Sequence, residues 1–314
     1  ASGLTLMALS LSACGGSSTT NDNDSGSSTD SGAAITPVSS VFTTEIDVLV
    51  GTSGDDTFTG DDGVVSAADQ VSAGDGVDTV KVYGQTTLPS VTGVENIEVH
   101  HTAAADFNIA TGDLAGVTKL TLDGLTINDK TVTLANDDTL VVRDATGANK
   151  DINITGSATT LLEANIVVEN SGDSTNAIDF DILGTLLDTI NLTSQGDNAA
   201  NFVNIVTSGT PTIKTVNITA TGKGMTVEDI DDATTIDASA STADITLASA
   251  VDKAVVSFGS GDDTYTMNQS ANAEATVTMG AGDDKVSITN LDAAGEMVDS
   301  KFAIDGGSGT DTLS

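Results

Sequence analysis

The stretch Ile152-Asn153-Ile154-Thr155 decides the fold, because it returns twice further along the chain. It returns as Ile-Asn-Leu-Thr at Ile190–Thr193 and as Val-Asn-Ile-Thr at Val216–Thr219. Each segment alternates apolar and polar residues, the pattern of a β-strand with one buried face. Looser copies of this alternation lie at 97–99, 120–122, 132–134, 245–247 and 277–279. The chain is therefore predicted to consist of many short strands separated by Gly, Asp and Asn turns.

The spacing of these strands favours a stack of coils. Val216, Ile236, Val256 and Val277 are separated by 20, 20 and 21 residues, a near-constant period that suits one coil of a solenoid. The fold class predicted is all-β, a parallel β-solenoid of the β-roll or β-helix kind with Gly/Asp-rich turns. An antiparallel β-sandwich, which also uses short alternating strands, is the structural alternative. Only 159–166 and 292–298 have a sequence compatible with short helices.

Composition agrees with a narrow core and an unusual surface. Aromatic residues make up 3% of the 314 residues and Trp is absent, which excludes a large aromatic core. The 46 acidic and 10 basic residues give 10 − 46 = −36, and most of the acids are Asp. This charge argues against nucleic acid as a partner. Cys14 is the single cysteine, so an intrachain disulfide framework is excluded.

The first part of the chain differs in composition from the rest. An apolar run at 4–13 is too short to span a bilayer and ends in small residues before Cys14. Leu11-Ser12-Ala13-Cys14 followed by Gly15 resembles the lipobox of bacterial lipoproteins, which implies a lipidated Cys14 in contact with outer-membrane lipid. We expect three parts: a residual signal peptide at 1–13, a flexible Ser/Gly/Asp-rich tether at 14–45 and the solenoid at 46–314. A disordered leader with an incidental cysteine is the alternative.

Five segments share the pattern Gly-x-Asp-x-apolar, and they fall in two groups, at 50–83 and 255–314. The aspartates are Asp56, Asp78, Asp263, Asp284 and Asp311, each two residues after a glycine, namely Gly54, Gly76, Gly261, Gly282 and Gly309. Four segments carry a further glycine two residues earlier, and the first carries one three residues earlier: Gly74, Gly259, Gly280, Gly307 and Gly51. Some 180 residues without the motif separate the two groups, so a few sites at the two ends are expected.

This pattern suits a hard cation. Glycine-rich turns can direct backbone carbonyls inward while Asp supplies carboxylate oxygen, which together make the oxygen-rich ligand set of calcium (Ca²⁺). The separations are 78 − 56 = 22, 284 − 263 = 21 and 311 − 284 = 27, of which the first two fit neighbouring coils. The apolar residue two after each Asp is expected to face the core: Phe58, Val80, Tyr265, Val286 and Leu313. Ordinary Gly-Asp turns without metal are the alternative.

The motif resembles the repeats-in-toxin (RTX) nonapeptide, and residues 306–313 match it fully. The resemblance implies calcium ions shared by turns on adjacent coils, with binding coupled to folding. Together with the acidity, the chain resembles calcium-dependent surface-layer (S-layer) proteins of Gram-negative bacteria. That likeness implies an extracellular structural protein that self-associates into a sheet or fibre on the outer face of the outer membrane.

The sequence offers little to support catalysis, and we expect no enzyme. His100 and His101 are the only histidines, and they lack the spacing of His-Glu-x-x-His. No Gly-x-Ser-x-Gly or P-loop segment occurs. A β-helix polysaccharide lyase using Arg143, beside Asp144, is a minor alternative. A monomeric calcium-stiffened adhesin or other ligand-binding solenoid, including an ice-binding one, is the main functional alternative. The motif strand that ends near Ser314 is expected to continue in further sequence or to dock on a partner.

Overall fold

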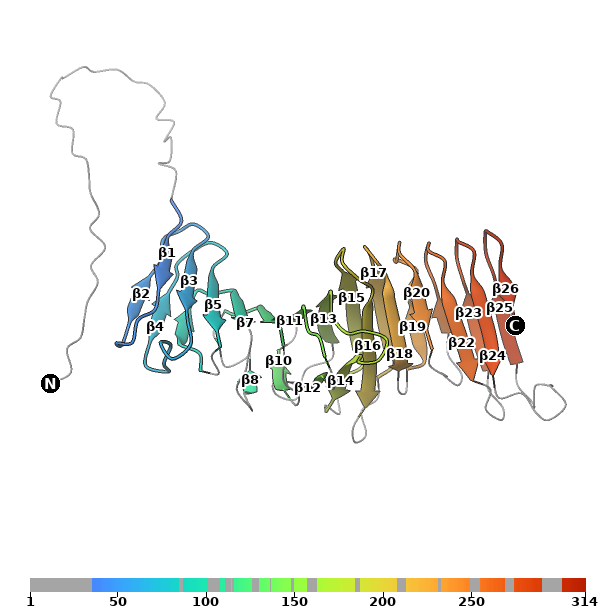
Figure 1. Cartoon of the computed structure of the whole chain (residues 1–314), viewed down its shortest axis with the longest axis horizontal. Helices are drawn as coiled ribbons and strands as arrows, with labels where there is room; N and C mark the ends of the chain where they lie inside the picture. Colours follow the sequence, from blue (N-terminus) through green and yellow to red (C-terminus); the bar gives the residue numbers. More distant parts are fainter. Residues whose placement is uncertain are drawn as a thin grey trace, which may run out of the picture.

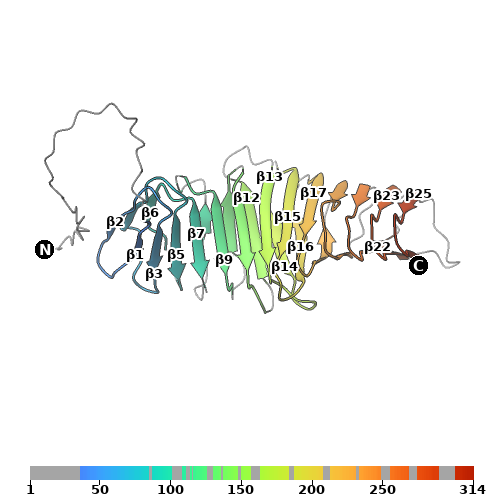
Figure 2. The same cartoon turned by 90° about the horizontal axis from the view of Figure 1, so that it is seen from above.

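The computed structural model shows a parallel β-solenoid, long and narrow in both views (Figures 1 and 2). It describes residues 36–84, 87–100, 108–110, 114, 116–125, 130–135, 137–147, 150–156, 163–183, 187–207, 213–230, 233–248, 255–268, 274–289 and 301–314. These residues contain strands and no helix. The predicted fold class is confirmed, and the antiparallel sandwich is excluded because all strand pairings are parallel.

One face of the solenoid is a 13-stranded sheet that receives one strand from each successive turn of the chain. Its strands, in order along the sheet, are β1 (Ser39–Val41), β3 (Thr57–Gly60), β5 (Thr79–Tyr83), β7 (Asn96–His100), β9 (Lys119–Asp123), β11 (Thr139–Arg143), β13 (Glu163–Glu169), β15 (Thr189–Gln195), β17 (Thr215–Ala220), β19 (Thr235–Asp237), β21 (Val255–Ser257), β23 (Glu274–Thr278) and β25 (Lys301–Asp305).

The opposite face is made of two further parallel sheets. A 10-stranded sheet contains β8 (Asn108–Ala110), β10 (Lys130–Leu134), β12 (Lys150–Gly156), β14 (Ile178–Ile182), β16 (Asn201–Thr207), β18 (Met225–Ile230), β20 (Ile245–Leu247), β22 (Thr264–Asn268), β24 (Lys285–Thr289) and β26 (Thr312–Leu313). A 3-stranded sheet near the N-terminal end contains β2 (Val48–Val50), β4 (Gln70–Ser72) and β6 (Ser90–Thr92).

The register confirms the period read from the sequence. Val216 pairs with Ile236, Ile236 with Val256, and Val256 with Val277, so the four residues form one column through the core. All four are buried. Burying each such side chain contributes about 1.5–3 kcal/mol, and stacking identical positions repeats this gain at every turn. The alternation in sequence therefore becomes a continuous aliphatic channel between the two faces.

The channel explains the shortage of aromatic residues. Its cluster of buried side chains is mostly Val, Ile, Leu and Ala, and the few large rings in it, such as Phe58, Phe180 and Tyr265, are fully buried. Facing strands supply small aliphatic side chains from both sides, and these fill a narrow space at close packing. A chain with so few aromatic residues can fold because each turn needs only a few short aliphatic residues inside.

Three expectations need revision. Residues 163–166 belong to β13 and are not helical, because the strand pairs over its whole length with β15. Residues 159–162 and 292–298 lie outside the described residues. Strand β1 precedes the expected boundary at residue 46, and Phe42 directly after it is buried in the core. Among the expected anchors, Phe58, Val80, Tyr265 and Val286 are buried, whereas Leu313 is 64% exposed because β26 is the edge strand of its sheet in this structure.

In the described part of the chain, no helical segment has the length and apolar character needed to cross a bilayer.

Candidate metal site at the stacked aspartate turns

Near the C-terminal end, the aspartates of the motif form a column along one edge of the solenoid. Asp263, Asp284 and Asp311 each stand directly before a strand of the 10-stranded sheet. Each carboxylate accepts a hydrogen bond from the backbone of the preceding turn: Asp263 Oδ1 from Ile245 N at 2.7 Å, Asp284 Oδ1 from Asp263 N at 2.8 Å, and Asp311 Oδ1 from Asp284 N at 3.2 Å. We call these three residues the inner column. The separation of 27 residues therefore also joins adjacent turns.

The second oxygen of two of these carboxylates has no protein partner. The Oδ2 atoms of Asp263 and Asp284 are buried and make no hydrogen bond, although the two residues are only 1% and 2% exposed. A buried carboxylate oxygen without a donor is costly, because it loses its water without replacement. A cation bound beside these two buried oxygens would offset their negative charge and replace the lost water.

The glycines of the motif permit close stacking of these turns. Residues Ser260, Ala281 and Ser308 pair as parallel bridges from turn to turn. A Cβ atom at Gly282 would lie 2.0 Å from Gly261 O, and one at Gly309 would lie 1.8 Å from Gly282 O. Both residues also have positive φ angles, of 144° and 139°. Only glycine fits there, so each carbonyl oxygen of the turn can approach the next turn closely.

A second acidic column runs beside the first on the exposed side of the turns. Asp262 N donates to Asp244 Oδ1 at 2.9 Å, Asp283 N to Asp262 Oδ1 at 2.8 Å, and Thr310 N to Asp283 Oδ1 at 2.8 Å. We call Asp244, Asp262 and Asp283 the outer column. Here each carboxylate accepts from the following turn, the opposite direction to the inner column. Six carboxylates thus gather on one edge over four turns.

Burial and mutual repulsion change the protonation of the inner column. Burial raises the pKa of Asp263 from 3.8 to about 7, and the carboxylates of Asp284, Asp244 and Asp262 add to this rise. Burial also raises the pKa of Asp284, and Asp311, Asp262 and Asp283 contribute to it by repulsion. The inner column therefore resists holding its full negative charge unless a cation offsets it.

These shifts predict a pH dependence of folding stability. The folded state binds the Asp263 proton up to pH of about 7, while the unfolded chain releases it near 3.8. Stability from this group is fully present below the unfolded pKa and is lost as pH rises through the folded pKa. In chelator, we expect thermal melting temperature to fall steadily between about pH 4 and pH 8. Saturating calcium should flatten or reverse this slope. A melting temperature that rises with pH in chelator would contradict the assignment.

The N-terminal group has the same construction on a different edge. Asp56 and Asp78 precede β3 and β5, strands of the 13-stranded sheet, whereas the C-terminal aspartates precede strands of the opposite face. Asp78 Oδ1 accepts from Asp56 N at 2.7 Å, and Asp78 N donates to Glu95 Oε2 at 2.8 Å. The Oδ2 of Asp78 is buried without a partner, and burial raises the pKa of this carboxyl, with repulsion from Asp56, Glu95 and Asp55 adding to it.

Asp56 differs from Asp78 because both of its oxygens are engaged. Its Oδ1 accepts from Val38 N at 2.6 Å, and its Oδ2 accepts from Thr52 N. The glycines still close the turn tightly: a Cβ atom at Gly51 would lie 2.3 Å from Asp56 Oδ2, one at Gly74 would lie 1.9 Å from Thr52 O, and one at Gly76 would lie 2.8 Å from Gly54 O. Asp56 therefore caps backbone amides, and Asp78 is the N-terminal carboxylate with an oxygen to offer.

Sequence reasoning missed a further aspartate pair at this end. Asp47 and Asp69 stand directly before β2 and β4, and Asp69 Oδ1 accepts from Asp47 N at 2.9 Å. The other oxygen of Asp69 accepts from Ser66 N at 2.7 Å, so this fully buried carboxylate is satisfied by amides alone. The sequence signal is an Asp immediately before a three-residue strand that contains valine. The pair shows what a purely structural aspartate looks like in this fold.

The residues present could supply calcium with two kinds of ligand, side-chain carboxylate oxygens and backbone carbonyl oxygens. In the described residues, no three His, Cys, Asp or Glu side chains converge on one point. A cation at Asp78, Asp263 or Asp284 would therefore take one buried carboxylate per turn and complete its shell with carbonyl oxygens of the stacked turns. That mixture of ligands is the one that calcium accepts and that transition metals do not prefer.

The other residues considered from the sequence lie elsewhere. His100 is on β7, stacked on Tyr83 with ring centroids 4.4 Å apart, and its Nδ1 lies 2.9 Å from Asp123 Oδ2. Arg143, on β11, forms an ion pair with Glu169 at 2.9 Å, and a longer one of 3.8 Å with Asp123. The pairing with Glu169 raises the pKa of the Arg143 guanidinium further. His101 and Cys14 lie outside the described residues, as do 1–35.

Comparison with protein-family models, with curated proteins and with solved structures finds no match for this chain. Fold and site together define it as a parallel β-solenoid whose two end sections carry stacked Gly/Asp turns.

Proposed function

We propose that the protein is a calcium-dependent structural protein of the bacterial cell surface, of the RTX type, which self-assembles into an extracellular layer or fibre. The observation that carries the calcium part is the set of buried, unpartnered Oδ2 atoms of Asp78, Asp263 and Asp284 within stacked turns. Each such atom needs positive charge, and calcium supplies it while bridging successive turns. The chain's own residues do the rest: the amides fix each carboxylate, and glycine keeps the turns close.

Charge supports a link between calcium and assembly. A net charge of −36 makes copies of the protein repel one another in dilute buffer. Divalent cations bound at the acidic turns, and more that screen the outer column, reduce this repulsion at the ends of the solenoid. Association between copies should therefore require calcium at a concentration typical of extracellular fluid.

An exposed apolar edge supports self-association. In the part of the chain that the structure describes, β1 and β2 each pair with a strand on one side only. Val41, Ile46, Val48 and Val50 on or beside these strands are exposed, and Val50 reaches 66%. Unprotected strand edges with apolar side chains are templates for pairing with another chain. The occupant we propose is a second copy of this protein.

The resemblance of Leu11–Gly15 to a lipobox supports a place at the cell surface, with lipidated Cys14 anchoring the protein in the outer membrane. The Ser/Gly/Asp-rich tether would then hold the solenoid away from the lipid.

Sedimentation velocity and electron microscopy of the full chain test the proposal. In millimolar calcium we expect large assemblies, and in chelator a monomer. Magnesium at the same concentration should act far more weakly, because it demands a near-ideal octahedral shell and releases its water reluctantly. The Val48→Glu and Val50→Glu variants should bind calcium but assemble poorly. A monomer in every buffer, stabilised by calcium, would contradict assembly and favour the adhesin alternative.

A further inference from the structure

We propose that calcium folds the two end sections of the solenoid separately, while a central section from about β11 to β20 stays folded without it. This inference rests on the proposed calcium binding and specifies how it regulates the molecule. It implies that the calcium-free protein is a shorter, intact solenoid with two loose ends, and not an unfolded chain.

The first argument comes from the buried caps along the edge that joins the 13-stranded to the 10-stranded sheet. At the C-terminal end of this edge, the backbone amides are capped by carboxylates of the inner column. In the centre, neutral side chains cap amides of the preceding turn in the same way. Asn201 Oδ1 accepts from Ser171 N at 2.7 Å, Ser171 Oγ from Ala145 N at 3.0 Å, and Ser241 Oγ from Ala220 N at 2.9 Å.

These central caps lie on the same edge as the acidic turns. Ser260 N donates to Ser241 O at 2.9 Å, and Ser260 pairs in turn with Ala281 in the first two motif turns. A neutral cap, Ser241 on Ala220 N, is therefore followed on the next turn by an acidic cap, Asp263 on Ile245 N. At the N-terminal end, on the other edge of the solenoid, the caps are also carboxylates: Asp78 Oδ1 caps Asp56 N at 2.7 Å, and Glu95 Oε2 caps Asp78 N at 2.8 Å.

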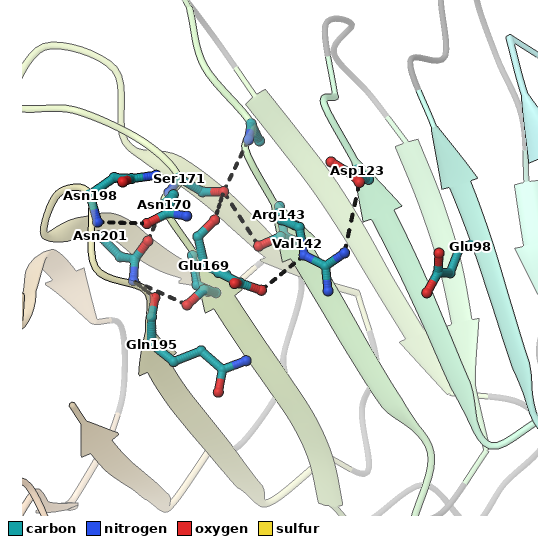
Figure 3. A network of polar contacts seen from close by, with 12 residues as sticks. Glu98, Asp123, Val142, Arg143, Glu169, Asn170, Ser171, Gln195, Asn198 and Asn201 are labelled. Carbon is teal, nitrogen blue, oxygen red and sulfur yellow. Dashed lines mark hydrogen bonds and ion pairs between the residues drawn. The ribbon is translucent and has the colours of Figure 1, made fainter. Parts of the chain in front are cut away.

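The second argument is that the network around Asn201 is complete without an ion. Asn201 is 1% exposed, and its Nδ2 lies within 3.0 Å of Val168 O, Ser194 Oγ and Gln195 O (Figure 3). Figure 3 shows this amide inside the corner, with Ser171 and the backbone of neighbouring turns around it. The motif aspartates Asp78, Asp263 and Asp284 each have a buried carboxylate oxygen without a partner, whereas the buried oxygen without a partner on β16, Asn204 Oδ1, belongs to an uncharged amide. A satisfied buried network stabilises a fold at any calcium concentration.

The third argument is the length of the strands. The central strands β13, β15 and β16 have 7 residues each, whereas the strands of the end sections have at most 5, as in β5, β22 and β24. Strands β19 and β20, at the C-terminal limit of the central section, have 3. The central face also carries an amide ladder, in which Asn191 Nδ2 donates to Asn165 Oδ1 and Asn217 Nδ2 to Asn191 Oδ1, both at 2.8 Å. Because the stability of a solenoid is close to a sum over neighbouring turns, the short-stranded ends depend most on added ions.

Hydrogen–deuterium exchange of the full chain, read by mass spectrometry in calcium, magnesium and chelator, tests the inference. Calcium should slow exchange by about tenfold or more in peptides from 57–83 and 264–314, and by less than about twofold in peptides from 139–230.

Asp78→Asn should abolish the calcium effect only at the N-terminal end, and Asp284→Asn only at the C-terminal end. An equal calcium effect in all three regions would overturn the inference while leaving calcium-dependent folding in place. No calcium effect on exchange in any region would overturn both the regional inference and the proposed calcium-dependent folding. A protein that shows the regional pattern but does not assemble would overturn only the proposed assembly.

Discussion

Replacing Asp284 by Asn is expected to remove calcium-dependent stabilisation of the C-terminal section without weakening the calcium-free protein. The Asn Oδ1 can still accept the hydrogen bond from Asp263 N, which measures 2.8 Å in the native structure. The uncharged amide replaces the oxygen that has no partner. In chelator at pH 7.5 the variant should therefore be as stable as the native protein or more stable, because a desolvated charge has been removed.

In saturating calcium the order should reverse. At a calcium concentration about 100 times the Kd, one bound ion stabilises the native protein by about 2.7 kcal/mol. For a cooperative section of about 60–100 residues, that gain corresponds to a rise of roughly 10–20 °C in the midpoint of the calcium-sensitive transition. Asp284→Asn should lose most of it. Circular dichroism melts in chelator and in calcium measure both effects.

Asp69→Asn is the matched control, because Asp69 is as deeply buried as Asp284 but uses both of its oxygens as acceptors for Asp47 N and Ser66 N. An amide must leave one of these donors unpaired, so this variant should lose about 1–3 kcal/mol in both buffers alike. If Asp284→Asn behaved like Asp69→Asn, with an equal loss in chelator and calcium, Asp284 would be a structural cap and the metal site would be rejected.

Replacing Asn201 by Ala is expected to have the largest effect of any single change in the centre. The substitution leaves Ser171 N without its acceptor and removes the donor to Val168 O, Ser194 Oγ and Gln195 O. Each buried polar group left unpaired costs about 1–3 kcal/mol, so we expect a total loss of about 3–5 kcal/mol. The loss should be the same with and without calcium, since no carboxylate takes part.

Asn198→Ala provides the control for that experiment. Asn198 lies in the loop directly before β16, the strand that begins at Asn201, but its side chain is exposed and only its backbone amide bonds to Asn170 Oδ1. This change should alter the free energy of unfolding by less than about 0.5 kcal/mol. Urea unfolding followed by circular dichroism measures both variants. Two results would contradict a calcium-independent centre: an Asn201→Ala protein that unfolds at the same urea concentration as the native protein, or one that is destabilised only in chelator.

Two kinds of side chain, acidic and neutral, cap the backbone amides at the corners of the solenoid. A solenoid edge exposes one backbone amide to the interior at each turn, and some acceptor must satisfy it. A carboxylate such as Asp284 does so but brings a charge and an oxygen without a partner, which we propose calcium compensates. An amide or hydroxyl such as Asn201 or Ser171 does so with no spare charge. Under this proposal, the type of cap at each turn determines whether that turn depends on calcium.

Much of the fold could be predicted from the sequence because it depends on local patterns. Alternation in segments such as Ile190–Thr193 specifies which side chains face inward, and the spacing of Val216, Ile236 and Val256 specifies how turns stack. Both patterns can be read directly from the sequence, because a strand has a period of two residues and a solenoid repeats at nearly constant length. The motif glycines could be identified for the same reason, as could the pairing of Asp56 with Asp78.

Tertiary structure decided what the aspartates can do. The five motif residues look equivalent in the sequence, yet Asp56 has both oxygens bonded to amides and Asp284 has one left over. Only stacking reveals that the two groups lie before strands of different sheets, that Asp311 joins Asp284 across 27 residues, and that Asn201 replaces a carboxylate in the centre. The physical reason is that hydrogen-bond partners here come from the neighbouring turn, about 20 to 30 residues away. A short motif identifies the residue at a corner. The hydrogen-bond partner of that residue depends on how many residues the intervening loops add to each turn.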